Sequence, residues 1–137
     1  AVGHAQVVGA LQEVKSNVDS GTFNAIQQAG ALALRRFDDP VVAAMRDLYR
    51  RRRERAAAGL RAAGFDLDTP DAGFFIWARC PGGDFTRTAA DLLDRADVVV
   101  VPGAGFSPRA REYIRLSLTA PTDRIQEAVR RLGRLNG

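Results

Sequence analysis

The residues best suited to chemistry lie at 113–118 (YIRLSL), where polar and apolar side chains alternate. Such alternation predicts a strand with one apolar face, and it places Arg115 on the opposite face. A guanidinium offers a planar fork of donors that suits bidentate capture of a carboxylate. Arg115 is therefore a candidate carboxylate-binding residue. The alternative is a solvated arginine on the open face of a sheet.

Two further segments accompany this strand. Residues 98–106 (VVVVPGAGF) read as an apolar strand that stops at a turn, in which Gly103 and Gly105 could present backbone N–H groups to an anion. Neither dinucleotide-binding nor P-loop spacing is complete there, so a plain turn is the alternative. Residues 73–77 (GFFIW) predict an aromatic strand whose rings either fill the sheet core or stack on a ligand.

The basic residues argue against a nucleic-acid site. Residues 50–53 are four consecutive arginines, and on a helix they point about 100° apart, so they form no single stripe. Asp47 and Glu54 are spaced for ion pairing with them. We interpret the run as a solvated helix surface. Lys15, the only lysine, falls near the end of a predicted helix, where a surface role is expected.

Composition narrows the class of protein. With 137 residues, 46% of them hydrophobic, the chain suits one domain or slightly more. Cys80 and His4 are the only residues of their types, which excludes an internal disulfide framework and disfavours a cysteine-based zinc site or a histidine-based catalytic triad. We predict no metal, no membrane span, no secretory signal and a cytoplasmic location. Because the sequence lacks an initiator methionine, we expect it to be a fragment.

The elements that must position Arg115 follow an α+β order, with three helices and then a ββαββα arrangement. Periodicity and capping residues predict helices at 4–14, 24–36, 40–63, 86–95 and from 122 onward, and strands at 65–68, 73–79, 98–101 and 113–118. Pro40 and Gly64 mark the ends of the longest helix.

Taken together, these segments resemble the C-terminal part of a fold type I, class I/II aminotransferase that depends on pyridoxal 5'-phosphate (PLP). Four stretches match in the right order: 14–21 with 25–30, 73–77, 98–106, and 113–122. The first and last most resemble the LL-diaminopimelate aminotransferase branch. The resemblance covers nearly all of this chain but only about the last third of the family's length.

The resemblance implies a division of the chain. Residues 1–37 would end the large PLP-binding domain, 38–64 would form a long linking helix, and 65–137 would form the small C-terminal domain. The N-terminal helices would then pack on a large domain that this chain lacks.

The resemblance also implies residue roles. Arg115 would grip the α-carboxylate of the substrate, and Gly103, Gly105 and Phe106 would lie near it. Ser20 falls in the segment that approaches the partner subunit's active site in a homodimer. Ser107 stands where the family normally has a further glycine, which leaves the local turn shape open.

For the cofactor, the resemblance implies PLP as the electron sink and a Schiff-base lysine just before Ala1. Lys15 does not occupy that position, so no catalytic residue is expected within the chain and we predict that it is inactive alone. The parent enzyme would transfer an amino group from an amino acid, with LL-diaminopimelate as the candidate donor, to a 2-oxo acid such as 2-oxoglutarate.

Two other interpretations stay open at this point. The chain could be a non-catalytic module that binds a small carboxylate through Arg115 or an acidic polymer through residues 50–55. It could also belong to another fold type I PLP enzyme, such as a lyase.

Overall fold

The computed structural model describes residues 2–83 and 85–132. The chain divides into two units, with the boundary between Ala43 and Ala44. This boundary falls inside the long helix α3 (Pro40–Ala62). In the part of the chain that the structure describes, none of the helices is long and apolar enough to cross a membrane.

The first unit contains the two predicted N-terminal helices, α1 (Ala5–Ser16) and α2 (Asn24–Arg35). Neither helix has a buried residue. In the turn between them, the Lys15 ammonium pairs with Asp19 at 2.6 Å, and Asp19 also accepts a hydrogen bond from the Gly21 N–H. The expected surface role of Lys15 is thus confirmed.

Helix α3 begins and ends where its capping residues predict. The Asp39 carboxylate accepts a hydrogen bond from the Val41 N–H at 3.0 Å, and Pro40 occupies the first helical position. At the other end Gly64 adopts φ +84°, a conformation that favours glycine. The Phe65 N–H then bonds to the Leu60 carbonyl at 3.0 Å, which is the six-to-one bond of a Schellman cap.

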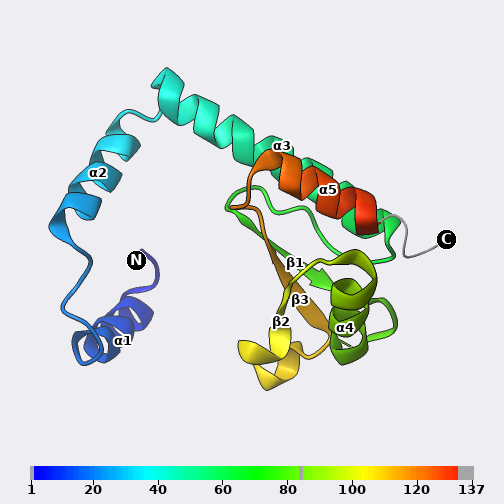
Figure 1. Cartoon of the computed structure of the whole chain (residues 1–137). Helices are drawn as coiled ribbons and strands as arrows, with labels where there is room; N and C mark the ends of the chain where they lie inside the picture. Colours follow the sequence, from blue (N-terminus) through cyan, green and yellow to red (C-terminus); the bar gives the residue numbers. More distant parts are fainter. Residues whose placement is uncertain (1, 84, 133–137) are drawn as a thin grey trace. The chain divides into compact units, whose positions relative to one another are not determined.

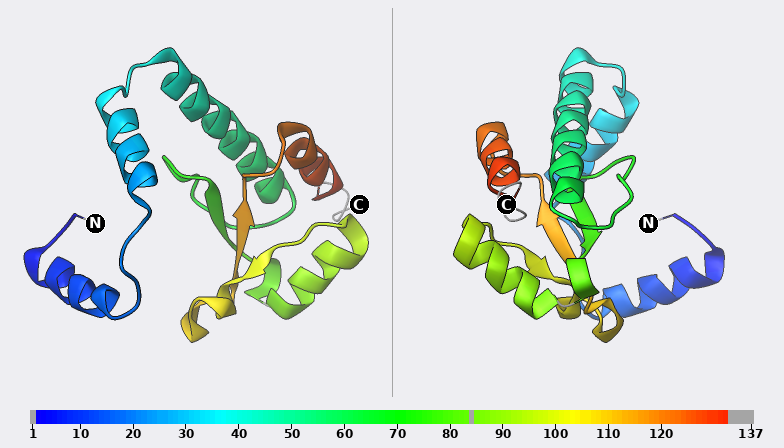
Figure 2. Two further views of the ribbon diagram at one scale, coloured as in Figure 1. Left: turned by 60° about the vertical axis from the view of Figure 1, so that its left-hand side comes forward. Right: turned by 90° about the vertical axis from the view of Figure 1, so that its right-hand side faces the viewer.

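The second unit is built on a three-stranded antiparallel sheet (Figures 1 and 2). Strand β3 (Tyr113–Ser117) lies in the middle, between β1 (Phe75–Arg79) and β2 (Val101–Pro102). The small α+β arrangement predicted from the sequence is therefore confirmed.

Two of the four predicted strands, those at 65–68 and 98–101, differ most from the structure. The segment 65–68 contributes only an isolated bridge between Asp66 and Arg79. The valine run forms a strand only from Val101, because the Val98 N–H bonds to the Leu92 carbonyl of α4 (Phe85–Ala96) at 2.9 Å. Val98 thereby closes the end of that helix instead of pairing with β3.

One face of the sheet carries the hydrophobic core. Ile76, Ala78 and Ile114 are fully buried there, and helices α3, α4 and α5 (Thr122–Leu132) add buried residues to the same cluster. Gly59 of α3 packs so closely on Val129 of α5 that a Cβ at position 59 would overlap the valine side chain. Figure 1 shows these two helices running side by side. Arg115 belongs to the other face of the sheet.

Candidate functional site

Arg115 lies at the centre of the sheet, on the face opposite the core. Its register partners are Trp77 on β1 and Val101 on β2, so both neighbouring strands support it. Ile114, one residue earlier, is fully buried, whereas Arg115 is half-buried. The alternation predicted for this strand is confirmed, and it directs the guanidinium away from the core.

Aromatic side chains surround the guanidinium. Its Cζ lies 4.1 Å from the ring centroid of Phe75 and 4.5 Å from that of Phe106. Trp77 meets Phe106 edge to face at 5.7 Å and stacks on Tyr113 at 5.5 Å. Phe75 and Trp77 are 38% and 39% exposed, so they flank Arg115 and do not fill the core.

The charge of Arg115 has no partner among residues 2–83 and 85–132. No ion pair links it to a described carboxylate, and its Nε is buried without a hydrogen-bond partner. The neighbouring Arg79, by contrast, pairs with Glu112 at 2.7 Å. A buried donor without an acceptor is costly, which makes the site receptive to an added anion. A planar carboxylate matches the donor geometry.

The glycine turn after β2 packs tightly against the same region. Gly103 is buried, and a Cβ there would overlap the Ala110 carbonyl oxygen and come within 2.9 Å of the Tyr113 carbonyl oxygen. The Phe106 and Ser107 N–H groups both bond to the Gly103 carbonyl, at 2.9 and 3.2 Å. The N–H groups of Phe106 and Ser107 are therefore used inside the turn and are not available to an anion. The turn instead positions Phe106.

Ser107 caps the short turn that follows. Its hydroxyl accepts a hydrogen bond from the Arg109 N–H at 3.2 Å, and its φ of −159° is extended backbone. No left-handed conformation is required at this position, so serine fits where the family normally has glycine.

The structure brings together only some of the predicted site residues. Phe106 contacts Arg115, and Gly103 lies against Trp77. Gly105 precedes Phe106, and no atom lies within 4 Å of the position that a Cβ would take there. Ser20 belongs to the first unit, where it is exposed in the turn before α2.

The prediction that residues 50–53 form a solvated surface is wrong for two of the four. Arg52 and Arg53 are only 9% and 8% exposed. Arg52 donates to the Leu118 carbonyl at 2.9 Å, and Arg53 donates to the Asp71 carbonyl at 2.8 Å. Their spacing from Ala56, Ala57 and Leu60 places them on the apolar stripe of α3, a signal that sequence reasoning overlooked.

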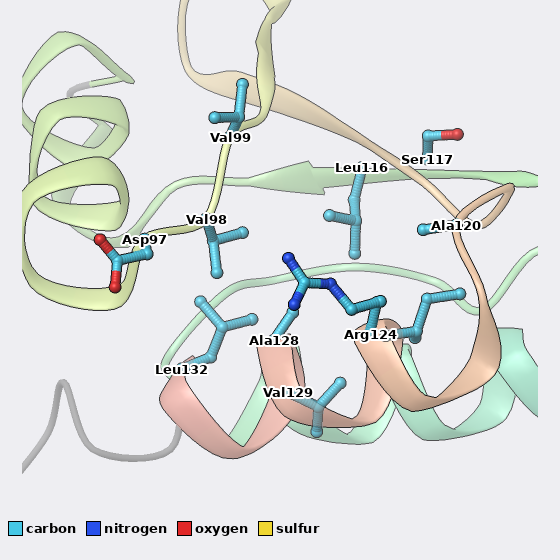
Figure 3. A pocket seen from close by; sticks show the side chains of 11 residues that line it. Asp97, Val98, Val99, Leu116, Ser117, Ala120, Arg124, Ala128, Val129 and Leu132 are labelled. Atoms are coloured by element: carbon cyan, nitrogen blue, oxygen red, sulfur yellow. The ribbon is translucent and has the colours of Figure 1, made fainter.

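A cavity of about 180 Å³ lies on the core side of the sheet, between β3, α5 and the segment before β2 (Figure 3). Its walls are mainly aliphatic, and among the described residues that line it Asp97 and Arg124 are the charged ones. Asp97 is already paired with Arg131 at 3.1 Å. Arg115 does not line this cavity, so the cavity is separate from the candidate site.

Comparisons with known proteins agree on one family. Residues 1–132 match the model of aminotransferase class I and II. An LL-diaminopimelate aminotransferase of Nitratidesulfovibrio vulgaris is 42% identical over 98% of this chain and 35% of the relative. The chain therefore spans about 35% of the length of such relatives.

Solved structures of aminotransferases also resemble the chain. An aminotransferase from Staphylococcus aureus superimposes with a TM-score of 0.67 at 28% identity, over 98% of this chain and 36% of that one. N-succinyldiaminopimelate aminotransferase from Mycobacterium tuberculosis gives a TM-score of 0.65 at 31% identity, again over 98% of this chain and 36% of the other. The fold thus matches the C-terminal part of a fold type I aminotransferase.

Proposed function

The chain belongs to the aminotransferase class I and II family, and on that premise we propose that it supplies the substrate-carboxylate site of a PLP-dependent aminotransferase. The observation that carries this proposal is the environment of Arg115. Its guanidinium is fixed in the central strand, flanked by Phe75 and Phe106, and has no anionic partner among the described residues. The carboxylate of an amino acid or a 2-oxo acid would supply the missing anionic partner of this guanidinium.

We propose LL-diaminopimelate as the amino donor and a 2-oxo acid such as 2-oxoglutarate as the acceptor. The support is the name shared by relatives that are about 40% identical over nearly the whole of this chain. Such an enzyme would serve amino-acid biosynthesis. The predicted cytoplasmic location remains a prediction from cysteine usage.

The family implies PLP, but Lys15, the only lysine of this sequence, does not fit the Schiff-base position. Its ammonium is exposed and ion-paired with Asp19 in the turn after α1, and does not lie in a site that could enclose a cofactor. We propose that the Schiff-base lysine lies in a preceding segment of a longer polypeptide. The chain alone would then be inactive, and its own share of the work is substrate binding.

We further propose that residues 1–37 belong to the large domain, 38–64 to the linking helix and 65–137 to the small domain. Large apolar side chains of the first unit are exposed, including Val7, Phe23 and Ile26, as expected of helices that pack on a further domain. In a homodimer, Ser20 would approach the partner subunit's site.

The structure gives little support to the other interpretation, in which the chain is a module that binds an acidic polymer through residues 50–55. Arg52 and Arg53 are buried and bonded to backbone carbonyls, and Arg50 pairs with Asp47 and Glu54 at 3.3 and 3.1 Å. Few free cations are left on this stretch to neutralise phosphates.

The test begins with the intact mass of the native polypeptide that contains this chain. A mass of about 14.8 kDa would contradict the proposal, because no suitable lysine would be present. If the polypeptide is longer, Arg115→Ala should sharply weaken binding of 2-oxoglutarate while leaving PLP absorbance unchanged. Arg111→Ala removes the same charge from an exposed position near the start of β3 and should have little effect.

A further inference from the structure

Among the described residues, aromatic side chains and not carboxylates contact the guanidinium of Arg115. Phe75, from β1, and Phe106, from the turn after β2, both lie within 4.5 Å of its Cζ, measured to the ring centroids. At this distance an aromatic ring attracts a cation through its quadrupole. It does not accept the hydrogen bonds that the N–H groups of the guanidinium donate within the guanidinium plane. The rings therefore hold the cation in place without using its N–H groups as hydrogen-bond donors.

Phe106 is itself anchored from two sides. Its N–H bonds to the Gly103 carbonyl at 2.9 Å, and its ring meets Trp77 edge to face at 5.7 Å. Trp77 in turn stacks on Tyr113 of the central strand. A ring tied to both the turn and the sheet has little freedom to leave the guanidinium.

We propose that Phe75 and Phe106 are positioning residues that hold Arg115 ready for a substrate carboxylate. This inference rests on the proposed function, in which Arg115 binds that carboxylate. A long flexible arginine normally loses rotamer freedom when it binds an anion, and that loss weakens affinity. The two rings impose the restriction before the substrate arrives. Removing either ring should then weaken carboxylate binding even though neither ring donates a hydrogen bond to the substrate.

The experiment measures the Kd of 2-oxoglutarate by calorimetry for the native polypeptide loaded with PLP. Phe75→Leu and Phe106→Leu keep an apolar side chain but remove the ring, and each should raise Kd about 10-fold. Phe106→Tyr keeps the ring and should bind within about 2-fold of the unchanged protein. In steady-state kinetics the leucine variants should raise KM and leave kcat nearly unchanged, because the same contact is present before and during the reaction.

A spectroscopic readout separates positioning from general loss of structure. The 15N-relaxation order parameter of the Arg115 Nε–H should be high in the ligand-free unchanged protein and in Phe106→Tyr, and lower in Phe106→Leu. Should Arg115→Ala weaken binding while both leucine variants leave Kd and this order parameter unchanged, the positioning role is overturned and the proposed function stands. If Arg115→Ala itself leaves Kd unchanged, both the proposed function and this inference fail.

Discussion

Arg52 of α3 donates a hydrogen bond from Nη1 to the carbonyl oxygen of Leu118, 2.9 Å away, across 66 positions of sequence. Its Nε donates to the Thr122 hydroxyl at 3.0 Å, at the first residue of α5. One buried guanidinium thus joins the long helix to the segment between the central strand and the last helix. The same segment follows directly on the strand that carries Arg115.

Replacing Arg52 by methionine should destabilise the second unit by about 1–3 kcal/mol, because the carbonyl of the buried Leu118 loses its hydrogen-bond donor. Urea denaturation of the native polypeptide measures this change. Hydrogen exchange at 113–120 should accelerate as well. Arg51→Met, at an exposed position of the same helix, serves as the control and should shift stability by less than about 0.5 kcal/mol. Equal effects of the two variants would refute the role assigned to Arg52.

Gly103 and Gly105 form a matched pair within one turn. Gly103→Ala should cost about 1–3 kcal/mol, because its methyl group would overlap the Ala110 carbonyl oxygen. It should also weaken 2-oxoglutarate binding by displacing Phe106. The methyl group that Gly105→Ala adds would have no atom within 4 Å. This variant should therefore change neither stability nor 2-oxoglutarate binding appreciably. Denaturation and calorimetry on the two variants test this, and a tolerated alanine at 103 would contradict the close approach.

A pH dependence is expected at the end of α5. Hydrogen bonds from Arg130 and then Arg131 hold the pKa of Glu127 at about 2, below its ordinary value of 4.5. Because the folded state has the lower pKa, this carboxylate contributes full stability above pH 4.5 and loses the contribution as the pH falls to about 2. The stability difference between the unchanged protein and Glu127→Gln should therefore shrink across that window. A constant difference from pH 6 to pH 2 would show that the ion pairs do not contribute as described.

Local rules explain which parts of the fold were predictable. Asp39 and Pro40 begin α3 and Gly64 ends it, as capping and glycine conformation require. Alternation at 113–118 correctly placed Ile114 in the core and Arg115 on the other face. Each of these features depends on a few neighbouring residues, so the sequence contains the necessary information.

Features that depend on distant partners were not predictable in this way. The contact between Phe75 and Arg115 needs the antiparallel register of β1 and β3, which no local pattern specifies. The valine run at 98–101 was overestimated as a strand, because the Val98 N–H bonds to α4. The hydrogen bond of Arg52 likewise depends on a carbonyl that the chain supplies only after the central strand.

The contact between Gly59 and Val129 provides a final prediction about how α3 and α5 pack. Gly59→Ala should lower stability by about 1–2 kcal/mol, because overlap with the valine outweighs the better helix propensity of alanine. In a double-mutant cycle, Val129→Ala should relieve most of the cost at position 59, giving a coupling of about 1 kcal/mol or more. Additive effects in urea denaturation would mean that these two side chains do not limit the approach of the helices.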